Sequence, residues 1–579
     1  MTRWSRRRVL AGVGALTAAG AAATWSATRP GVQPDLRLPA TPGANRYNIL
    51  LVTTDQEQAW SLLPPGFIED HCPGRARLLR ECLSFDRAFT PSPVCATARA
   101  ILYTGQHSQK NGVWENMPLP YAPALKKDVP TLGTLMRGAG YHAAYFGKWH
   151  LSKLYARHHK TLTKGQVQAE IRSYGFDETG TEHEIDGPLG GHEEDGRTID
   201  GAVAFIERSK SASMPWFAAV NILNPHDIMY YTSGPKMTAT RKILYPDTLA
   251  RPPETKVYQE ALGYSLPANF GPVSDDGRLR AAIEYALTDE YSLGHLNFQD
   301  AAAVAEFVNY YYNCIRESDA HIVRLLDALD ASGQADRTIV VFTADHGEML
   351  GVHGIRGKGV LPYREATQVP LLVRHPARPG GQSTATLASH VDMAPTLLGL
   401  AGVPSATVRQ QVPALVGRDL SAVIADAACH DPRAGSDGLL LHWTSLIYQD
   451  HQAALAFEAE RRQGRSLSMM ALIKPEFRGV LSNRGQMRGV FDGRYKFARY
   501  FAPTQHNSPL SWDDLVALND LELYDTQADP GETRNLATRP EAVRDLILEM
   551  NAKLGRLIAR EIGIDDGRHM PGPDFIWRA

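Results

Sequence analysis

The 579-residue sequence predicts an α/β fold, with a large, mostly parallel sheet sandwiched by helices and a smaller C-terminal α+β domain. Continuous apolar, β-branched runs alternate with helical patterns along the first two thirds of the chain. These runs lack the in-out alternation of a half-exposed strand, so they predict strands buried on both faces. The last third instead reads as strands followed by a helix, and the length is sufficient for two domains.

The strands and helices of the first domain follow one another in a regular order. We predict strands over residues 48–53, 141–146, 216–223 and 338–343, and helices over residues 129–137, 198–208 and 302–329. Residues 228–299 lack a clear period apart from helical spacing near 278–286. This stretch is expected to be a long loop region that lies over a ligand site and sets the choice of ligand. A surface insertion without a role fits the composition as well.

We place the larger α/β domain at residues 46–425 and the smaller C-terminal domain at residues 426–579. Strands are predicted there over residues 439–442 and 489–500, the second broken at Asp492-Gly493. Residues 541–560 carry apolar side chains at helical spacing.

The first thirty residues have the pattern of an export signal. Arg6 and Arg7 precede an Ala/Gly/Leu/Val run without acidic residues, as in a twin-arginine signal, and residues 31–45 form a Pro-rich linker. An ordinary secretory signal or a retained N-terminal anchor are the alternatives. We therefore expect a periplasmic or secreted protein, with no stable membrane insertion after signal removal.

The charge balance limits the possible partners, and the cysteine count limits the possible disulfides. The chain has 61 Lys+Arg against 63 Asp+Glu, so no nucleic-acid partner is expected. Five cysteines are too few for a disulfide framework in a chain of this length. Cys72 and Cys82 could pair, and the odd count leaves at least one thiol unpaired, for which Cys95 is the candidate.

Cys95 lies at the start of a predicted helix. Two prolines precede it, and residues 96–104 have helical composition before the stop signal at Gly105. Free backbone N–H groups at a helix start favour negative charge, and Arg99 lies one turn later on the same face. A nucleophile beside a fixed cation suits attack on an anionic ester. The alternative is a buried structural cysteine with a solvated arginine.

Seven polar residues fall just after predicted strands, at the edge where open α/β sheets bind ligands. They are Asp55, Gln56, Lys148, His150, His226, Asp345 and His346. Three oxygen side chains and an imidazole (Asp55, Gln56, Asp345 and His346) suit a hard divalent cation, with Ca²⁺ first and Mn²⁺ or Mg²⁺ next. Lysines, including Lys358, and Arg99 can hold ester oxygens, and a histidine can act as general acid. His353 could also line the pocket; two acidic helix caps are the alternative to a metal site.

Several motifs occur in a fixed order along nearly the whole mature chain. They are Asn48-Ile49-Leu50-Leu51-Val52 with Asp55, Cys95 to Arg99 with Tyr103-Thr104-Gly105, Gly147-Lys148-Trp149-His150-Leu151, Pro225-His226, Asp345-His346-Gly347-Glu348, Ser389 to Thr396, Glu522-Leu523-Tyr524-Asp525 and Asp529-Pro530-Gly531-Glu532. With them the chain resembles a formylglycine-dependent sulfatase of the alkaline phosphatase superfamily, which implies an alkaline phosphatase-like fold.

The resemblance also implies a chemistry. Cys95 would be converted by a formylglycine-generating enzyme into formylglycine, whose hydrated aldehyde attacks the sulfur of a small-molecule or saccharide sulfate ester. By the family pattern Asp55, Gln56, Asp345 and His346 hold the metal, and Arg99 steadies the formylglycine. Lys148 and His150 then bind the sulfate and the diol, while His226 and Lys358 serve the leaving oxygen.

Two positions depart from the pattern. Thr97 stands where the modification signature usually has Pro or Ala, so a non-catalytic anion-binding homologue with unmodified Cys95 is one alternative. Gln56 together with His346 is similar to the choline-sulfatase and phosphonate monoester hydrolase branch. A phosphonate monoester or phosphodiester hydrolase with the same nucleophile is therefore the second alternative.

Overall fold

The structure is a computed structural model. It describes residues 32–567 and 570, except for 117–121, 153, 155–161, 234–250, 272–278, 293, 360, 430 and 464–479. The expected export signal and parts of the expected loop region over residues 228–299 lie outside the described residues. Across the described ranges, no helix combines the length and apolar character needed to cross a membrane.

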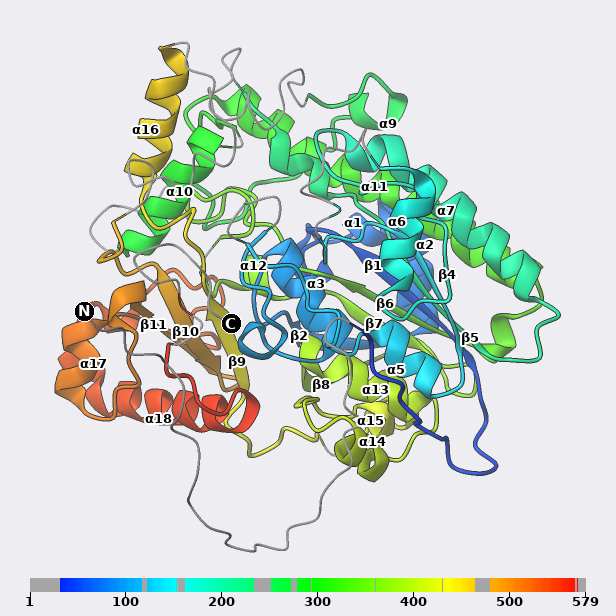
Figure 1. Ribbon diagram of the computed structural model, residues 1–579. Helices are drawn as coiled ribbons and strands as arrows, with labels where there is room; N and C mark the ends of the chain where they lie inside the picture. Colours follow the sequence, from blue (N-terminus) through cyan, green and yellow to red (C-terminus); the bar gives the residue numbers. More distant parts are fainter. Residues whose placement is uncertain are drawn as a thin grey trace, which may run out of the picture.

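The larger sheet is mixed and has eight strands in the order β4-β3-β5-β1-β6-β7-β2-β8 (Figure 1). Its strands are β1 (Asn48–Thr54), β2 (Leu83–Phe89), β3 (His142–Gly147), β4 (Glu178–Thr179), β5 (Trp216–Asn221), β6 (Thr338–Ala344), β7 (Leu371–Arg374) and β8 (Gln382–Ser389). Only β7 runs antiparallel to its neighbours, β6 and β2, among these strands. The predicted mostly parallel sheet is confirmed.

Helices cover both faces of the central strands, which explains their unbroken apolar runs. Ile49 and Leu51 of β1 pack under α3 (Cys95–Thr104), α5 (Leu132–Gly138) and α13 (Met393–Leu400). Leu50 and Val52 point to the opposite face, under α7 (Gly190–Ser209) and α11 (Ala301–Ala331). Alternate residues of one strand thus bury against two helical layers.

Helix α7 begins at Gly190, eight positions before the residue that sequence periodicity indicated. Its first two turns contain glycines and charged residues, which carry no apolar repeat. The carboxylate of Asp227 accepts the amide N–H groups of Gly191 and His192, at 3.0 Å each, and so stabilises the helix start from outside the helix. Helix α10 (Arg280–Ser292) likewise runs beyond the predicted 278–286.

The C-terminal region holds a second, antiparallel sheet in the order β12-β11-β10-β9. Its strands are β9 (Leu439–Trp443), β10 (Gln486–Phe491), β11 (Tyr495–Phe501) and β12 (Asp520–Asp525). The predicted strand 489–500 is a hairpin, β10 and β11, that turns at Asp492-Gly493. Helix α18 (Arg544–Glu561) packs on one face, and side chains from β2 and β8 of the larger sheet pack on the other.

All five cysteines are free thiols. Cys72 and Cys82 lie on either side of α2 (Pro73–Glu81), and both are buried. The pairing that the sequence left open is therefore not made.

Candidate active site

The polar residues that follow the strands meet at one edge of the large sheet. Asp55 comes directly after β1, Lys148 after β3 and Asp345 after β6. His226 follows β5 through a turn that contains the cis peptide bond Asn224–Pro225. Because β3, β5, β1 and β6 are parallel neighbours, their carboxyl ends bring these side chains together.

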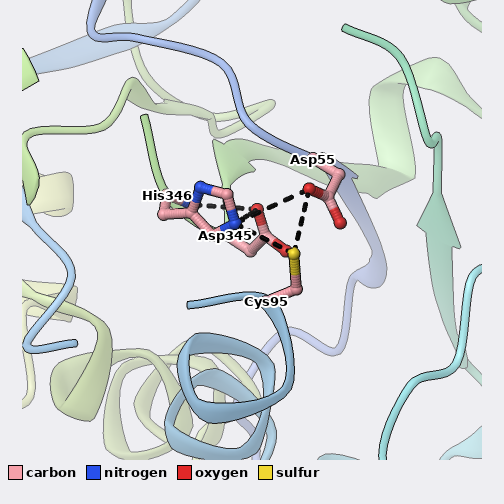
Figure 2. Close-up of side chains that lie close together, drawn as sticks. All are labelled: Asp55, Cys95, Asp345 and His346. Atoms are coloured by element: carbon pink, nitrogen blue, oxygen red, sulfur yellow. Dashed lines mark hydrogen bonds and ion pairs between the residues drawn. The ribbon is translucent and has the colours of Figure 1, made fainter. Parts of the chain in front are cut away.

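Cys95 is the first residue of α3, and its side chain points at the ends of β1 and β6 (Figure 2). Its Sγ lies 3.1 Å from His346 Nε2 and 3.6 Å from Asp55 Oδ1. Lys358 donates to the same sulfur over 2.8 Å. Burial, followed by the charge of Asp55, raises the pKa of the thiol to about 12 although two lysines oppose the shift. The unmodified side chain is therefore a neutral, weak nucleophile.

Asp55, Cys95, Asp345 and His346 each offer a donor atom, and these atoms lie within 4.8 Å of one another. Asp345 accepts the amide N–H of His346 over 2.8 Å. His346 Nδ1 lies 2.9 Å from the carbonyl oxygen of Gly347, which turns Nε2 into the site. Two buried carboxylates side by side are costly without a cation between them, so the donor set fits a bound metal ion.

Gln56 adds an oxygen next to this cluster. Its backbone has a φ of 68°, and its amide N–H donates to Asp345 Oδ1 over 3.2 Å. Its side-chain Nε2 donates to Glu348, while its Oε1 accepts from Lys358 Nζ over 3.0 Å. The side-chain oxygen of Gln56 is thereby directed toward the site.

Arg99 lies beneath the site with its guanidinium fully buried. It donates to the hydroxyl of Tyr145 over 2.9 Å, to Asn221 Oδ1 over 2.7 Å and to the carbonyl oxygens of Lys148 and Trp149. Its closest carboxylate is Asp345, 3.7 Å away. Arg99 thus braces the turn after β3 against α3.

That turn carries Lys148 and His150. Lys148 Nζ lies 2.8 Å from Asp55 Oδ2, and neither side chain is exposed. Glu184 accepts the amide N–H groups of Trp149 and His150 at 3.0 Å each, which holds His150 at a φ of 53°. Burial raises the pKa of Glu184 to about 7.

His226 is buried beside the same charges. Burial and then the cation of Lys148 hold its pKa well below the usual value, and Asp55 opposes the shift. Its Nδ1 lies 3.8 Å from Asp186 Oδ1. His353, by contrast, packs against the ring of Tyr363, with ring centroids 4.2 Å apart and an interplanar angle of 32°.

Sequence reasoning missed Glu184 and Asp186. Both lie between β4 and α7 in irregular structure, where no periodic pattern marks a functional position. It also missed the bracing by Tyr145 and Asn221, because Tyr145 lies inside β3 and Asn221 lies within the strand predicted over residues 216–223.

The chain is similar to known proteins over most of its length. The family model described as Sulfatase matches residues 47–403. An uncharacterized sulfatase of Escherichia coli is 29% identical over 360 residues, which are 56% of this chain and 62% of that protein. The match thus spans less than two thirds of that relative. An N-acetylglucosamine-6-O-sulfatase of Bacteroides thetaiotaomicron is 26% identical over 424 residues, covering 63% of this chain and 69% of the relative.

Solved structures share the fold. A 2-O GAG sulfatase superposes with a TM-score of 0.61 at 20% identity, covering 90% of this chain and 94% of that one. A phosphonate monoester hydrolase of Agrobacterium radiobacter gives a TM-score of 0.59 at 21% identity, with 89% and 96% covered. Since the family model matches more than half of the chain, this protein belongs to the sulfatase family of enzymes.

Proposed function

We propose that this protein is a metal-dependent sulfuric ester hydrolase that releases inorganic sulfate through a formylglycine made from Cys95. The observation that carries the proposal is the surroundings of Cys95 Sγ. Within 3.6 Å of that atom lie a carboxylate of Asp55, the imidazole of His346 and the ammonium of Lys358. A nucleophile at this position reaches metal donors and an anion-binding cation together.

Two properties of Cys95 bear on its modification: the high pKa of its thiol is a reason for it, and its burial limits when it can occur. Its buried thiol has a pKa of about 12, so the unmodified residue is a weak nucleophile near neutral pH. A formylglycine hydrate instead offers two hydroxyl groups, one to bond to sulfur and a second to expel sulfate. Because Cys95 is only 1% exposed, a formylglycine-generating enzyme would have to act before the chain folds.

Asp55, Gln56, Asp345 and His346 would hold the metal ion, with Ca²⁺ favoured over Mn²⁺ or Mg²⁺ by the oxygen-rich donor set. When bound, a divalent cation polarises the ester and lowers the pKa of a nearby nucleophile.

The remaining residues of the site bind the ester and move a proton. Lys148 and Lys358 stabilise the negative sulfate oxygens, and His150 binds the sulfate beside Lys148. His226 gives a proton to the leaving oxygen. Arg99 lies on α3, the helix that carries the nucleophile, and donates to the carbonyl oxygen of Lys148. It thereby fixes the nucleophile relative to the turn that carries Lys148.

We favour a sulfated saccharide as the substrate class, because one relative is an N-acetylglucosamine-6-O-sulfatase. We further propose that the paired arginines Arg6 and Arg7 direct export by the twin-arginine route, to the periplasm or the medium. Replacing both by lysine, which keeps the charge, is expected to leave the protein in the cytoplasm on fractionation.

The decisive experiment combines a mass measurement with a substrate panel. Protein from a host that makes formylglycine is digested, and the peptide that spans Cys95 is weighed for an aldehyde or its hydrate. Sulfate release is then measured from 4-nitrophenyl sulfate, glucosamine 6-sulfate and choline sulfate, beside an aryl phosphodiester and an aryl phosphonate. We expect sulfate release that Cys95→Ala abolishes. Faster turnover of the phosphorus esters would establish the phosphonate monoester or phosphodiester hydrolase instead, and an intact thiol would favour the non-catalytic anion-binding homologue.

A further inference from the structure

A carboxylate that no motif predicts lies between two of the proposed catalytic side chains. Asp186 Oδ1 is 3.8 Å from His226 Nδ1 and 4.0 Å from Lys148 Nζ, and its side chain is only 4% exposed. It belongs to the irregular segment between β4 and α7.

The position of Asp186 is fixed from both sides. Tyr230 donates its hydroxyl to Asp186 Oδ1 over 3.1 Å, and Tyr230 and His226 are the two ends of the same short helix, η2 (His226–Tyr230). Their rings meet edge to face with centroids 5.6 Å apart. Two residues earlier, Glu184 accepts the amide N–H of His150. The segment is thus attached to the element that carries His226 and to the turn that carries Lys148.

Of these two neighbours, His226 is the one that needs Asp186. Lys148 already has a closer carboxylate, Asp55, at 2.8 Å. His226 Nδ1 has no hydrogen-bond partner among the described residues, and Asp186 is the carboxylate that pairs with it. The other charged or titratable groups that act on His226 are Lys148, Lys358, Asp55 and His346. Burial and the charges of Lys148 and Lys358 disfavour the imidazolium form of His226 that proton donation needs, and a carboxylate at close range favours that form.

We propose that Asp186 is the positioning residue of a carboxylate–histidine pair that prepares His226 to protonate the leaving alcohol. The inference rests on the proposed function. As the bond between sulfur and the bridging oxygen breaks, its electron pair stays on that oxygen, which takes the proton from His226 Nε2. A new bond joins sulfur to a deprotonated hydroxyl of the formylglycine hydrate at position 95. His226 becomes neutral and keeps its Nδ1 proton, directed at Asp186, which stays ionised throughout.

The 3.8 Å separation is compatible with this role, because catalytic hydrogen bonds are commonly long before substrate binds and tighten in the reacting complex. A small rotation of the imidazole would convert the contact into a charge-assisted hydrogen bond. This bond keeps one proton on Nδ1, so the proton that the imidazolium gives to the leaving oxygen is the one on Nε2.

Dependence on the leaving group tests the pair. Asp186→Asn keeps the size of the side chain and an acceptor for Tyr230 but removes the charge. For an alkyl or saccharide sulfate, whose alkoxide needs a proton, we expect kcat to fall by about 10²-fold or more. For 4-nitrophenyl sulfate, whose phenolate leaves unprotonated, we expect a change of less than about fivefold, since acid catalysis contributes little there. Tyr230→Phe should give a smaller loss in the same direction.

Two comparisons separate positioning from a structural role. In a His226→Ala background, Asp186→Asn should cost nothing further, as expected for residues that act as a unit. Glu182→Gln, at an exposed neighbouring carboxylate that pairs with Lys164, should leave both substrates unaffected. Equal losses of activity on both substrates, or no loss on either, would contradict the proposal that Asp186 positions His226.

A second measurement does not depend on turnover. Nitrogen-15 NMR of the histidines in the full-length metal-loaded protein should show His226 protonated at Nδ1, with a pKa that falls in Asp186→Asn. An unchanged His226 signal would overturn the pair even if no ester in the panel were hydrolysed, whereas a shifted signal without hydrolysis would refute only the proposed function.

Discussion

Lys358 donates from Nζ to Cys95 Sγ over 2.8 Å, although the two residues are 263 positions apart in the chain. Burial alone would lower the pKa of Lys358, but the neighbouring Cys95 and Asp55 raise it above its ordinary value. A permanent cation therefore contacts the position of the nucleophile. The charge of a transferring sulfate group would develop next to it.

Replacing Lys358 by methionine, which has a similar length but no charge, should lower kcat/KM for 4-nitrophenyl sulfate by about 10²- to 10³-fold, the usual cost of one preorganised donor. Lys164→Met, at a lysine that is 58% exposed, is the matched control and should leave the rate unchanged. A Lys358→Met rate within about fivefold of wild type would show that the cation does not contact the transferring group.

The site was largely predictable because it is made of strand ends. In a parallel sheet the carboxyl ends of neighbouring strands lie together, so Asp55, Lys148, His226 and Asp345 could be grouped without knowing the strand order. Their strands were equally clear, since burial on both faces leaves an unbroken apolar run.

Other features depend on contacts that sequence periodicity does not encode. Strand β7 has only four residues, and β2 includes the charged pair Asp86 and Arg87, so neither reads as a buried strand. Asp186 reaches His226 through an irregular segment, and α7 starts where Asp227 supplies the cap. These positions are set by tertiary packing.

Thr97 is expected to limit the modification of Cys95 without being needed by the fold. It is the third residue of α3 and 1% exposed, and its hydroxyl has no hydrogen-bond partner in the described part of the chain. Thr97→Ala removes that hydroxyl, and Thr97→Pro fits because amide groups of the first helical turn lack an acceptor within the helix.

Both substitutions should raise the fraction of chains that carry formylglycine, measured by mass spectrometry of the peptide that spans Cys95. The melting temperature should change little. Thr134→Ala, in α5 and outside the motif that contains Cys95, should give no increase. A fraction that stays at the wild-type level in both Thr97 variants would show that the residue has no influence on the modifying enzyme.

Chelation should destabilise the protein as well as inactivate it, because Asp55 and Asp345 are buried side by side. A ligand that binds only the folded state adds about 2.7 kcal/mol at a hundred times its Kd. We expect EGTA to lower the melting temperature, and Ca²⁺ to restore it more fully than Mg²⁺. Asp345→Asn should abolish this response.

The control for chelation is Asp450→Asn. Asp450 belongs to a separate acidic group with Glu284 and His451, whose carboxylates already accept hydrogen bonds from the protein. Its loss should leave the response to Ca²⁺ intact. A melting temperature that is indifferent to the chelator in an active wild-type enzyme would argue against a structural metal ion at Asp55 and Asp345.

A buried ion pair between α18 and the segment after α3 should make stability depend on acid pH. Glu561 of α18 lies 2.9 Å from His107 Nε2 and is 3% exposed. Burial opposes its ionisation, but the hydrogen bond and charge of His107, together with Arg433 and Arg560, outweigh burial and lower its pKa to about 2. A carboxyl whose folded-state pKa is depressed stabilises the fold above its unfolded pKa, near 4.3, and loses that contribution as pH falls toward 2.

At pH 6, Glu561→Gln should therefore lower the free energy of unfolding by up to about 3 kcal/mol, and the difference should shrink toward pH 3. Glu549→Gln, on the same helix but 59% exposed, should show almost no difference at either pH in denaturant titrations. A deficit in Glu561→Gln that stays constant with pH would mean that the variant loses packing and not the charge.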